Sequence, residues 1–318
     1  MIPMSGTPAS SHRNVRLRAD LLLLLTSVVW GSAFVAQRVA AENTSVFLFN
    51  GLRFMLGALV LLPFALSQQP RIERSSAHKP FPSILLAGLL LFSAGTLQQL
   101  GLRYTTAGNA GFISGLYVVF VPIFLALGAR RRLRLPVWLA ALLAGLGLFL
   151  LSTGGQIRLA RGDALELGGA ILFAFHVIWI DRLAGKVKIL PLAIGQYLVT
   201  ALLSLSIGLM LESGILQTIQ AAWVPILYTG VFSIGLGYTL QVVGQQVAPP
   251  ADASILLSME APFAAVFGWL LLGEHLSAIQ LVGCGFMLAG MLLAQFNSFS
   301  TLRKSQLFDS GEIPSQDP

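Results

Sequence analysis

The chain has 318 residues, of which 55% are hydrophobic and only 10% are charged. Soluble domains carry about 25% charged residues, so a soluble globular fold is excluded and most of this chain must be solvated by lipid. The net charge of +7 would suggest nucleic acid as the partner of a soluble protein. Here the basic residues fall between apolar runs, where they report orientation in a membrane. The single cysteine, Cys284, excludes an intrachain disulfide.

Apolar runs of membrane length follow one another along the whole chain. We count ten, at about 20–37, 46–66, 82–102, 109–129, 135–152, 164–180, 191–211, 222–243, 252–272 and 277–295. The first run follows basic residues as a secretory signal does, but no small-x-small cleavage site comes after it, so we expect a retained helix. Residues 1–18 and 297–318 are polar, lack apolar periodicity and are expected to be disordered cytoplasmic tails.

The second half of the chain repeats features of the first half in the same order. Asp20 aligns with Asp163, and Pro122 aligns with Pro262 at nearly the same spacing. These matches predict two repeats of five spans each. Because five is odd, the second repeat enters the membrane from the opposite side, which gives inverted repeats, an arrangement typical of secondary transporters.

The basic residues lie mainly on one side of the predicted membrane. The segments predicted to be inside hold fifteen Lys and Arg residues, the outer segments hold four, and Arg53 lies within a span. A bias of this kind marks the cytoplasmic side. We therefore expect a multi-pass protein of the bacterial inner (plasma) membrane with both termini in the cytoplasm.

Each half of the chain carries its own short sequence marks. They are Val-Trp-Gly-Ser at 29–32, Gly-Leu-Arg-Phe at 51–54, Tyr-Thr-Thr-Ala at 104–107, Gly-Asp at 162–163, Glu-Ala-Pro at 260–262 and Gly-Trp-Leu-Leu-Leu-Gly-Glu at 268–274. With these marks, residues 20–295 resemble two copies of the EamA domain, the repeat unit of the drug/metabolite transporter superfamily. One departure is Gly128-Ala129-Arg130, where the family often closes the fourth span with Gly-Glu.

The resemblance implies a fold and a class of function. The fold would be an all-α membrane protein with ten transmembrane helices in two inverted five-helix EamA repeats, at residues 19–153 and 161–296. The function would be a secondary transporter, and specifically an exporter, of small organic solutes such as amino acids or metabolites. It would work by alternating access, either coupled to protons or driven by the gradient of the solute itself. The resemblance says almost nothing about which solute is carried.

Glu260 is the sharpest candidate for a functional residue. It lies about eight residues after Asp252, which is roughly 12 Å into a hydrocarbon layer of about 30 Å. An ionisable side chain is costly at this depth and usually faces protein or a wet cavity. We predict that Glu260 exchanges the coupled proton. The alternative is a glutamate that only hydrogen-bonds a neighbouring helix.

Two prolines occupy equivalent places in the two repeats. Pro122 lies in the fourth apolar run and Pro262 in the ninth. A proline inside a helix frees a backbone carbonyl and loosens the helix. We predict that this pair marks gating kinks.

Arg53 and Glu274 are ionisable residues nearer to span ends. Arg53 lies about seven residues into the second run, where it would either snorkel to the surface or point inward and hold an anionic group of the solute. Glu274 ends the ninth run and is expected to lie at the interface without contacting the solute.

Amides and aromatic residues are scattered through most of the spans. The predicted substrate-binding residues are Trp30, Arg53, Gln98, Gln99, Tyr117, His176, Trp179, Gln196 and Tyr238. Together they suit a solute with polar and apolar faces, whereas any single one is better explained as an interhelical hydrogen bond worth about 0.6 kcal/mol. The fifth and tenth runs lack such residues and carry the small-residue pairs Ala141/Gly145 and Gly285/Ala289, which predict tight packing at the rim.

No cofactor, metal site or catalytic motif is expected. The four histidines are far apart and the cysteine has no partner. The motifs GxxxxGK[ST], HExxH and GxSxG are absent from the sequence. An alternative function is a membrane-embedded enzyme that uses Glu260 and His176 as an acid–base pair, although no second carboxylate or nucleophile accompanies them. The expected partners are a small-molecule solute and the lipid bilayer but no nucleic acid, and pairing with a second copy of the chain stays open.

Overall fold

The computed structural model of the chain is a bundle of helices, and no strand occurs in the residues that it describes. These residues are 8–67, 80–128, 135–153, 160–183, 186–211, 214–248, 253, 256–257, 259–290 and 292–293. The tail expected at 297–318 lies outside them. The ninth predicted run is described in part, because most residues of 252–258 are also outside.

The first half of the chain forms six helices. They are α1 (Pro8–Asn43), α2 (Val46–Ser67), α3 (Pro80–Gly101), α4 (Ala107–Ser114), α5 (Tyr117–Gly128) and α6 (Leu135–Thr153). The second half forms α7 (Arg161–Leu183), α8 (Ile189–Leu211), α9 (Ile215–Tyr228), the π-helix η1 (Thr229–Tyr238), α10 (Thr239–Gly244), α12 (Glu260–Leu272) and the helix Ala278–Gly290.

Seven helical segments among the described residues are long and apolar enough to cross a membrane. They are Val15–Glu42, Val46–Ser67, Phe81–Gly101, Ala107–Gly128, Arg161–Leu183, Ile189–Leu211 and Ile215–Gly244. Three shorter apolar helices, Trp138–Leu151, Glu260–Leu272 and Ala278–Gly290, fall in the other three predicted runs. The protein is therefore an all-helical, multi-pass membrane protein.

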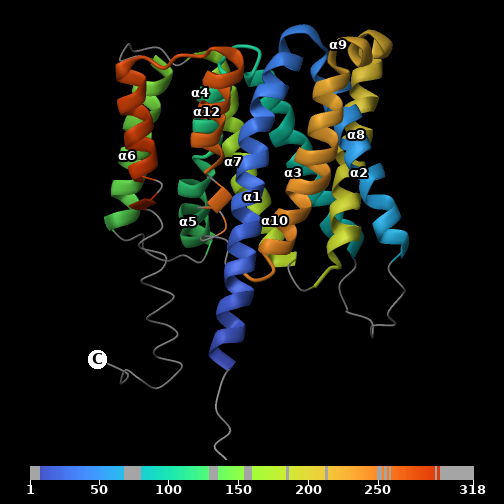
Figure 1. Cartoon of the computed structure of the whole chain (residues 1–318), viewed down its shortest axis with the longest axis horizontal. Coiled ribbons are helices and arrows are strands. Elements are labelled where there is room, and N and C mark those ends of the chain that lie inside the picture. Colours follow the sequence, from blue (N-terminus) through green and yellow to red (C-terminus); the bar gives the residue numbers. More distant parts are fainter. Residues whose placement is uncertain are drawn as a thin grey trace, which may run out of the picture.

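The first helix begins earlier than the apolar pattern predicts. α1 starts at Pro8, inside the segment 1–18 that the sequence suggests is a loose tail. Proline is tolerated in the first turn of a helix. Arg16 then donates a hydrogen bond to Asp20 at 2.9 Å, an ion pair one turn apart that supports a helix. In Figure 1 this polar extension projects below the bundle.

The fourth predicted run is a broken helix. α4 and α5 are separated by Gly115 and Leu116. The N–H of Gly115 still donates to the carbonyl of Gly111, four residues earlier, at 3.0 Å. The N–H of Leu116 donates to the carbonyl of Ile113, only three residues earlier, at 3.1 Å. This change from four-residue to three-residue spacing tightens the turn. A break of this kind is tolerated at membrane depth where protein covers it, and Gly115 and Leu116 are both buried.

Helices at equivalent places in the two halves run antiparallel. A Cβ atom built on Gly147 of α6 would lie 2.6 Å from the carbonyl oxygen of Gly283, and one built on Gly290 would lie 2.7 Å from that of Ala140. Residue numbers therefore rise along one helix as they fall along the other. This pair stands at one side of the bundle in Figure 1, with α2 and α8 toward the other side. Antiparallel packing of equivalent helices is what inverted repeats require.

The prediction that the pairs Ala141/Gly145 and Gly285/Ala289 make the tight contact of these helices is wrong for both glycines. Among the described residues, nothing lies within 4 Å of a Cβ atom built on Gly145 or on Gly285. α6 and the helix Ala278–Gly290 approach each other through Gly147 and Gly283 instead. Small residues four apart mark one stripe of a helix, but the rotation of the helix decides which stripe meets its neighbour.

This difference generates a matched pair of variants. Alanine is favoured over glycine inside a helix by about 1 kcal/mol, so Gly145→Ala should keep or raise the melting temperature. Gly147→Ala places a methyl group against the backbone of Gly283 and Met287, where overpacking costs about 1–3 kcal/mol. It should lower the melting temperature of the protein in detergent. Equal melting temperatures for the two variants would contradict this packing.

Candidate functional site

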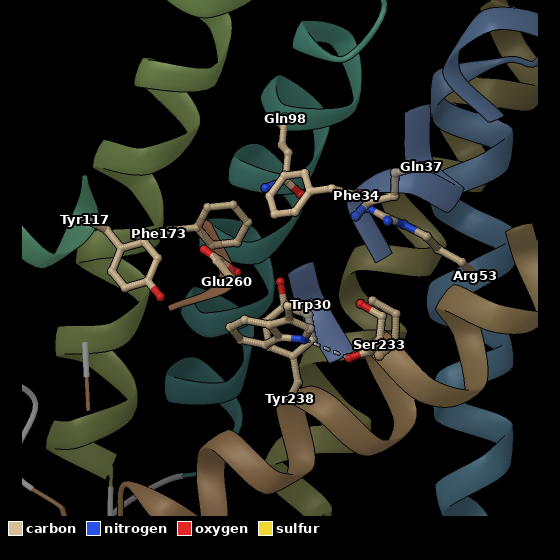
Figure 2. Close-up of a pocket in the computed structure, with 11 residues that line it drawn as sticks. Trp30, Phe34, Gln37, Arg53, Gln98, Tyr117, Phe173, Ser233, Tyr238 and Glu260 are labelled. Atoms are coloured by element: carbon tan, nitrogen blue, oxygen red, sulfur yellow. Dashed lines mark hydrogen bonds between the residues drawn. The ribbon is translucent and has the colours of Figure 1, made fainter. Parts of the chain in front are cut away.

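A cavity lies inside the bundle, between helices of both halves of the chain (Figure 2). It is lined by Trp30, Phe34 and Gln37 of α1, Arg53 of α2, Gln98 of α3, Tyr117 of α5, Phe173 of α7, Ser233, Ile234 and Tyr238 of η1, and Glu260 of α12. Its volume, measured as the space open to the centres of water-sized molecules, is about 30 Å³. One water needs about 10–15 Å³ of such room. In this conformation the cavity therefore holds a few waters and must widen for a larger solute.

Arg53 points into this cavity and does not snorkel to the membrane surface. Its side chain is 2% exposed, and the guanidinium carbon lies 5.2 Å and 5.3 Å from the ring centres of Phe49 and Phe54. In the described part of the chain Arg53 forms no ion pair, and its Nε has no acceptor. Aromatic faces attract a cation but leave its N–H groups unsatisfied. An anionic ligand would complete this environment.

Glu260 enters the cavity from the start of α12 (Figure 2). Its side chain is 5% exposed. Within the described residues no hydrogen bond or ion pair engages its carboxylate. The first turn of a helix carries partial positive charge, which favours a carboxylate at this position. The cavity thus holds one unpaired basic group and one unpaired acidic group, from opposite halves of the chain.

Tyr238 is the centre of an aromatic cluster between these two groups. Its ring lies 4.6 Å from Trp30, 6.1 Å from Tyr197 and 6.3 Å from Phe54, measured between ring centres. The indole nitrogen of Trp30 donates to the carbonyl of Ser233 at 3.1 Å. That carbonyl belongs to η1, and π-helical segments often occur at functional sites.

The structure separates the predicted site residues into two groups. Trp30, Arg53, Gln98, Tyr117, Tyr238 and Glu260 line the cavity. Gln99, His176, Trp179 and Gln196 lie outside the lining and hydrogen-bond other protein groups. Gln99 donates to the carbonyl of Gln37 at 3.0 Å, and Trp179 donates to that of Ser83 at 2.9 Å.

His176 and Glu260 do not meet. The Nε2 atom of His176 bonds Oε1 of Gln196 at 2.9 Å, and the histidine ring, which is outside the lining, lies 6.1 Å from that of Tyr238 at an interplanar angle of 85°. The acid–base pair of the enzyme alternative is therefore not assembled in this conformation.

The sequence prediction of site residues leaves out five lining residues, Phe34, Gln37, Phe173, Ser233 and Ile234. Three of them are apolar and have no signal that separates them from ordinary packing residues. It also missed Glu166, whose side chain is completely buried in α7. The rule that an ionisable residue inside a span is a functional candidate should have selected Glu166 along with Glu260.

The predicted gating prolines lie next to the irregular parts of the backbone. Pro122 is inside α5, six residues after the break that ends at Leu116, and Pro262 is in the first turn of α12. A proline at this place in α12 costs little, because the first N–H groups of a helix have no intrahelical partner. Whether either proline gates the cavity stays a prediction.

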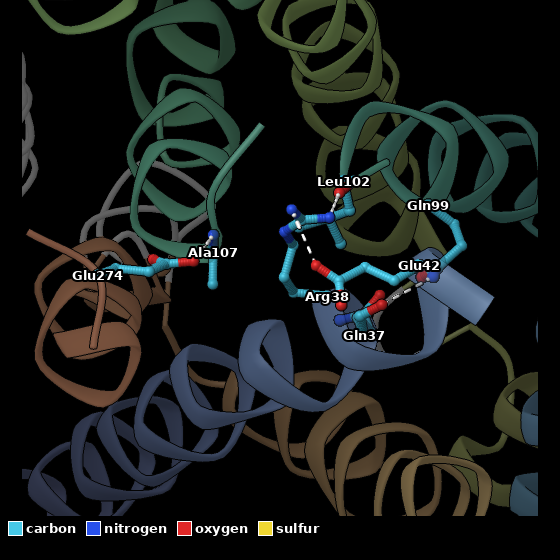
Figure 3. Close-up of polar contacts among 7 residues, drawn as sticks. All are labelled: Gln37, Arg38, Glu42, Gln99, Leu102, Ala107 and Glu274. Carbon is cyan, nitrogen blue, oxygen red and sulfur yellow. Dashed lines mark hydrogen bonds and ion pairs between the residues drawn. The ribbon is translucent and has the colours of Figure 1, made fainter. Parts of the chain in front are cut away.

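The upper end of the bundle is the end at which α1 and α3 finish and α4 begins (Figure 1). Arg38 donates to the carbonyl of Leu102 at 2.9 Å and pairs with Glu42 at 3.1 Å, as Figure 3 shows. The bonds from Arg38 to Leu102 and from Gln99 to Gln37 tie α1 to the end of α3 beside the cavity.

Glu274 joins the two halves of the chain at the upper end (Figure 3). Its Oε1 accepts from the N–H of Ala107 at 2.9 Å, and its Oε2 accepts from that of Gly108 at 3.0 Å. The hydroxyl of Thr106 accepts from the N–H of Asn109 at 3.1 Å. The first N–H groups of α4 are thereby satisfied, and a carboxylate stands at the positive end of that helix. Glu274 caps a helix of the other half, a contact that sequence alone does not show.

Comparison with known proteins matches the chain twice to the EamA-like transporter family, over residues 17–153 and residues 160–296. An uncharacterized transporter of Archaeoglobus fulgidus is 30% identical over 278 residues, covering 87% of this chain and 86% of that protein. The threonine/homoserine exporter RhtA of Escherichia coli K12 is 31% identical over 296 residues, covering 89% and 92%. A solved crystal structure superposes with a TM-score of 0.66 over 89% of this chain and 98% of the other, at 17% identity, which shows a shared fold alone.

Proposed function

The chain belongs to the EamA-like transporter family, and we propose that it exports small zwitterionic solutes, of which amino acids are the best candidates, across the bacterial inner membrane. The family and both named relatives agree with a transporter rather than an enzyme. The observation that carries the choice of solute is the pair of unpaired charged residues, Arg53 and Glu260, in one aromatic-lined cavity.

A zwitterion satisfies both charged residues at once. Its carboxylate would accept the guanidinium hydrogen bonds of Arg53, which favour a planar anionic partner. Its ammonium group would face Glu260 and the rings of Trp30 and Tyr238, to which a cation is attracted. The small cavity suits a small side chain, and RhtA is named as an exporter of threonine and homoserine. L-threonine is therefore the first solute to test.

Ten spans in two inverted repeats support an alternating-access mechanism. In this proposal the helices Trp138–Leu151, Glu260–Leu272 and Ala278–Gly290 belong to membrane spans together with the seven longer ones. Support comes from the two family matches, from the antiparallel packing of equivalent helices and from the charge bias of the sequence. Arg53 and Glu260 belong to different repeats, so a solute between them would respond to movement of one repeat against the other.

The proposed number of spans also predicts the orientation of the protein in the membrane. Ten spans return the chain to the side on which it starts, and the basic residues assign that side to the cytoplasm. A C-terminal alkaline phosphatase fusion should be inactive, and a C-terminal green fluorescent fusion should be bright. An active phosphatase with a dark fluorescent fusion would contradict ten spans.

Arg53 should control recognition of the solute carboxylate. In proteoliposomes, the wild-type protein should exchange labelled for unlabelled L-threonine. Arg53→Met should raise the KM of this exchange by about one to two orders of magnitude, because a hydrogen bond to a charged group is worth about 1.5–3 kcal/mol. Arg53→Lys keeps the charge but loses the planar, forked guanidinium, so its KM should lie between the values of the wild type and Arg53→Met.

Two controls sharpen this test. Arg161→Met removes an arginine that packs on Tyr104 outside the cavity and should leave the KM unchanged. Isopropanolamine, which is threonine without its carboxylate, should inhibit the wild type and Arg53→Met equally. An unchanged KM in Arg53→Met would remove Arg53 from the binding site. Absence of exchange by the wild type with every amino acid tried would refute amino-acid transport.

Glu260 is proposed to couple proton movement to this transport. Its protonated and ionised forms must then favour differently facing states of the carrier. Glutamine has the shape of the protonated form but cannot titrate. Glu260→Gln should abolish accumulation of L-threonine driven by a pH gradient and leave most of the exchange of solute for solute. Accumulation at the wild-type rate would show that Glu260 does not couple, and Glu42→Gln, at an exposed carboxylate of the upper end outside the cavity lining, serves as the control.

A further inference from the structure

Glu166 is a second buried carboxylate close to the cavity but not in its lining. It lies in the second turn of α7 and is 0% exposed. A Cβ atom built on Gly101 of α3 would lie 2.8 Å from its Oε1, so the absence of a side chain at Gly101 makes room for this carboxylate. In the described residues neither Lys nor Arg pairs with it.

A chain of hydrogen bonds connects Glu166 to the cavity. The hydroxyl of Ser114 donates to Oε2 of Glu166 at 3.2 Å, and Nε2 of Gln98 donates to that hydroxyl at 3.1 Å. Gln98 itself is one of the residues that line the cavity (Figure 2). The other oxygen, Oε1 of Glu166, is buried with no hydrogen-bond partner in the described structure.

We propose that Glu166 is a second proton-binding residue of the transporter, and that Ser114 and Gln98 pass its protonation state to the solute cavity. This inference rests on the transport function proposed above. The charged groups near enough to act on Glu166 are Asp163 on its own helix and Glu260 at the start of α12, and both are acidic. A buried carboxylate with only acidic neighbours is costly in its ionised form, which is the condition for binding a proton.

Protonation reverses the direction of the hydrogen-bond chain. An ionised carboxylate only accepts, so Ser114 donates to it and receives a bond from the NH₂ group of Gln98. In the proposed protonated state, a proton supplied by hydronium of the solvent, which is left as water, forms an O–H bond on Oε2 and not on Oε1, and this O–H group donates to Ser114. The serine hydroxyl must in turn donate to Gln98, and only the amide oxygen can accept. The amide then presents its NH₂ group to the cavity in place of its oxygen.

The cavity would therefore offer the solute different groups in the two states. An amide oxygen attracts the ammonium group of a zwitterion, whereas an NH₂ group attracts its carboxylate. Glu166 acts through Gln98 and is a positioning residue for the solute, whereas Glu260 faces the solute directly. The alternative is a purely structural role, in which Glu166 only anchors α7 to α4. In that case the KM for the solute would not depend on the protonation of Glu166.

Infrared spectroscopy of the purified, solute-free protein tests the proton site without any assumption about transport. The difference spectrum between mildly acidic and mildly alkaline pH should lose one carboxyl component in Glu166→Gln. The same component should shift in Ser114→Ala, which removes its hydrogen-bond donor. Ser204→Ala, at a buried hydroxyl with no partner in the described residues, should leave the spectrum unchanged. A wild-type spectrum in Glu166→Gln would overturn the proposal. Should that variant fail to fold, an unshifted spectrum in Ser114→Ala would overturn it.

Exchange of L-threonine in proteoliposomes tests the connection to the cavity. The wild-type KM should change about fivefold between the two pH values, the effect of one hydrogen bond to the solute. This contribution should be lost in Glu166→Gln and Ser114→Ala, in which only the pH dependence due to Glu260 remains, and should return in Ser114→Thr, which keeps a hydroxyl. Wild-type pH profiles in both defective variants would overturn the role of the chain. If the wild type exchanged no L-threonine, the transport proposal would fail, and the infrared result would still decide whether Glu166 binds a proton.

Discussion

The cost of a charge without a counter-charge inside the hydrocarbon layer is the constraint on which this structure depends. Arg53 and Glu260 lie deep in the bundle, and neither pairs with another described residue. Each has a partial substitute for a counter-ion. The rings of Phe49 and Phe54 flank the guanidinium, and the start of α12 supports the carboxylate. Such substitutes stabilise a charge without satisfying it, so a ligand with both charges would be better accommodated than water.

Unsatisfied backbone groups inside the membrane are subject to the same constraint as unpaired charges. Irregular backbone at membrane depth needs protein around it, because lipid cannot satisfy free N–H and C=O groups. The break between α4 and α5, the start of α12 and the π-helix η1 all lie at the cavity, where Tyr117, Glu260 and Tyr238 face inward. The first N–H groups of α4, which are also buried, are satisfied by Thr106 and Glu274. The cavity is therefore built where the helices are least regular.

The sequence predicts the helical runs well, because a membrane requires a minimum length of apolar residues. It does not predict the rotation of a helix about its axis. Rotation decides that Arg53 points inward, and it decides that α6 packs through Gly147 and not through Gly145. The polar side chain of His176 is paired with Gln196 outside the lining for the same reason. Partners that lie far away in the chain, such as Ala107 for Glu274, are also invisible without the fold.

The contacts between the two halves differ in chemistry at the two ends of the bundle. At the upper end they use carboxylates, since Thr105 donates to Asp163 at 2.6 Å and Glu274 accepts from Ala107 and Gly108. At the other end a neutral pair, Trp179 and the carbonyl of Ser83, joins α7 to α3. A carboxylate that accepts on both oxygens loses one of those bonds when it takes a proton, whereas the neutral pair is indifferent to pH. In an alternating-access cycle, the ties at one end must break while those at the other end hold. Protonation would therefore weaken the ties at the upper end and leave the tie at the other end unchanged.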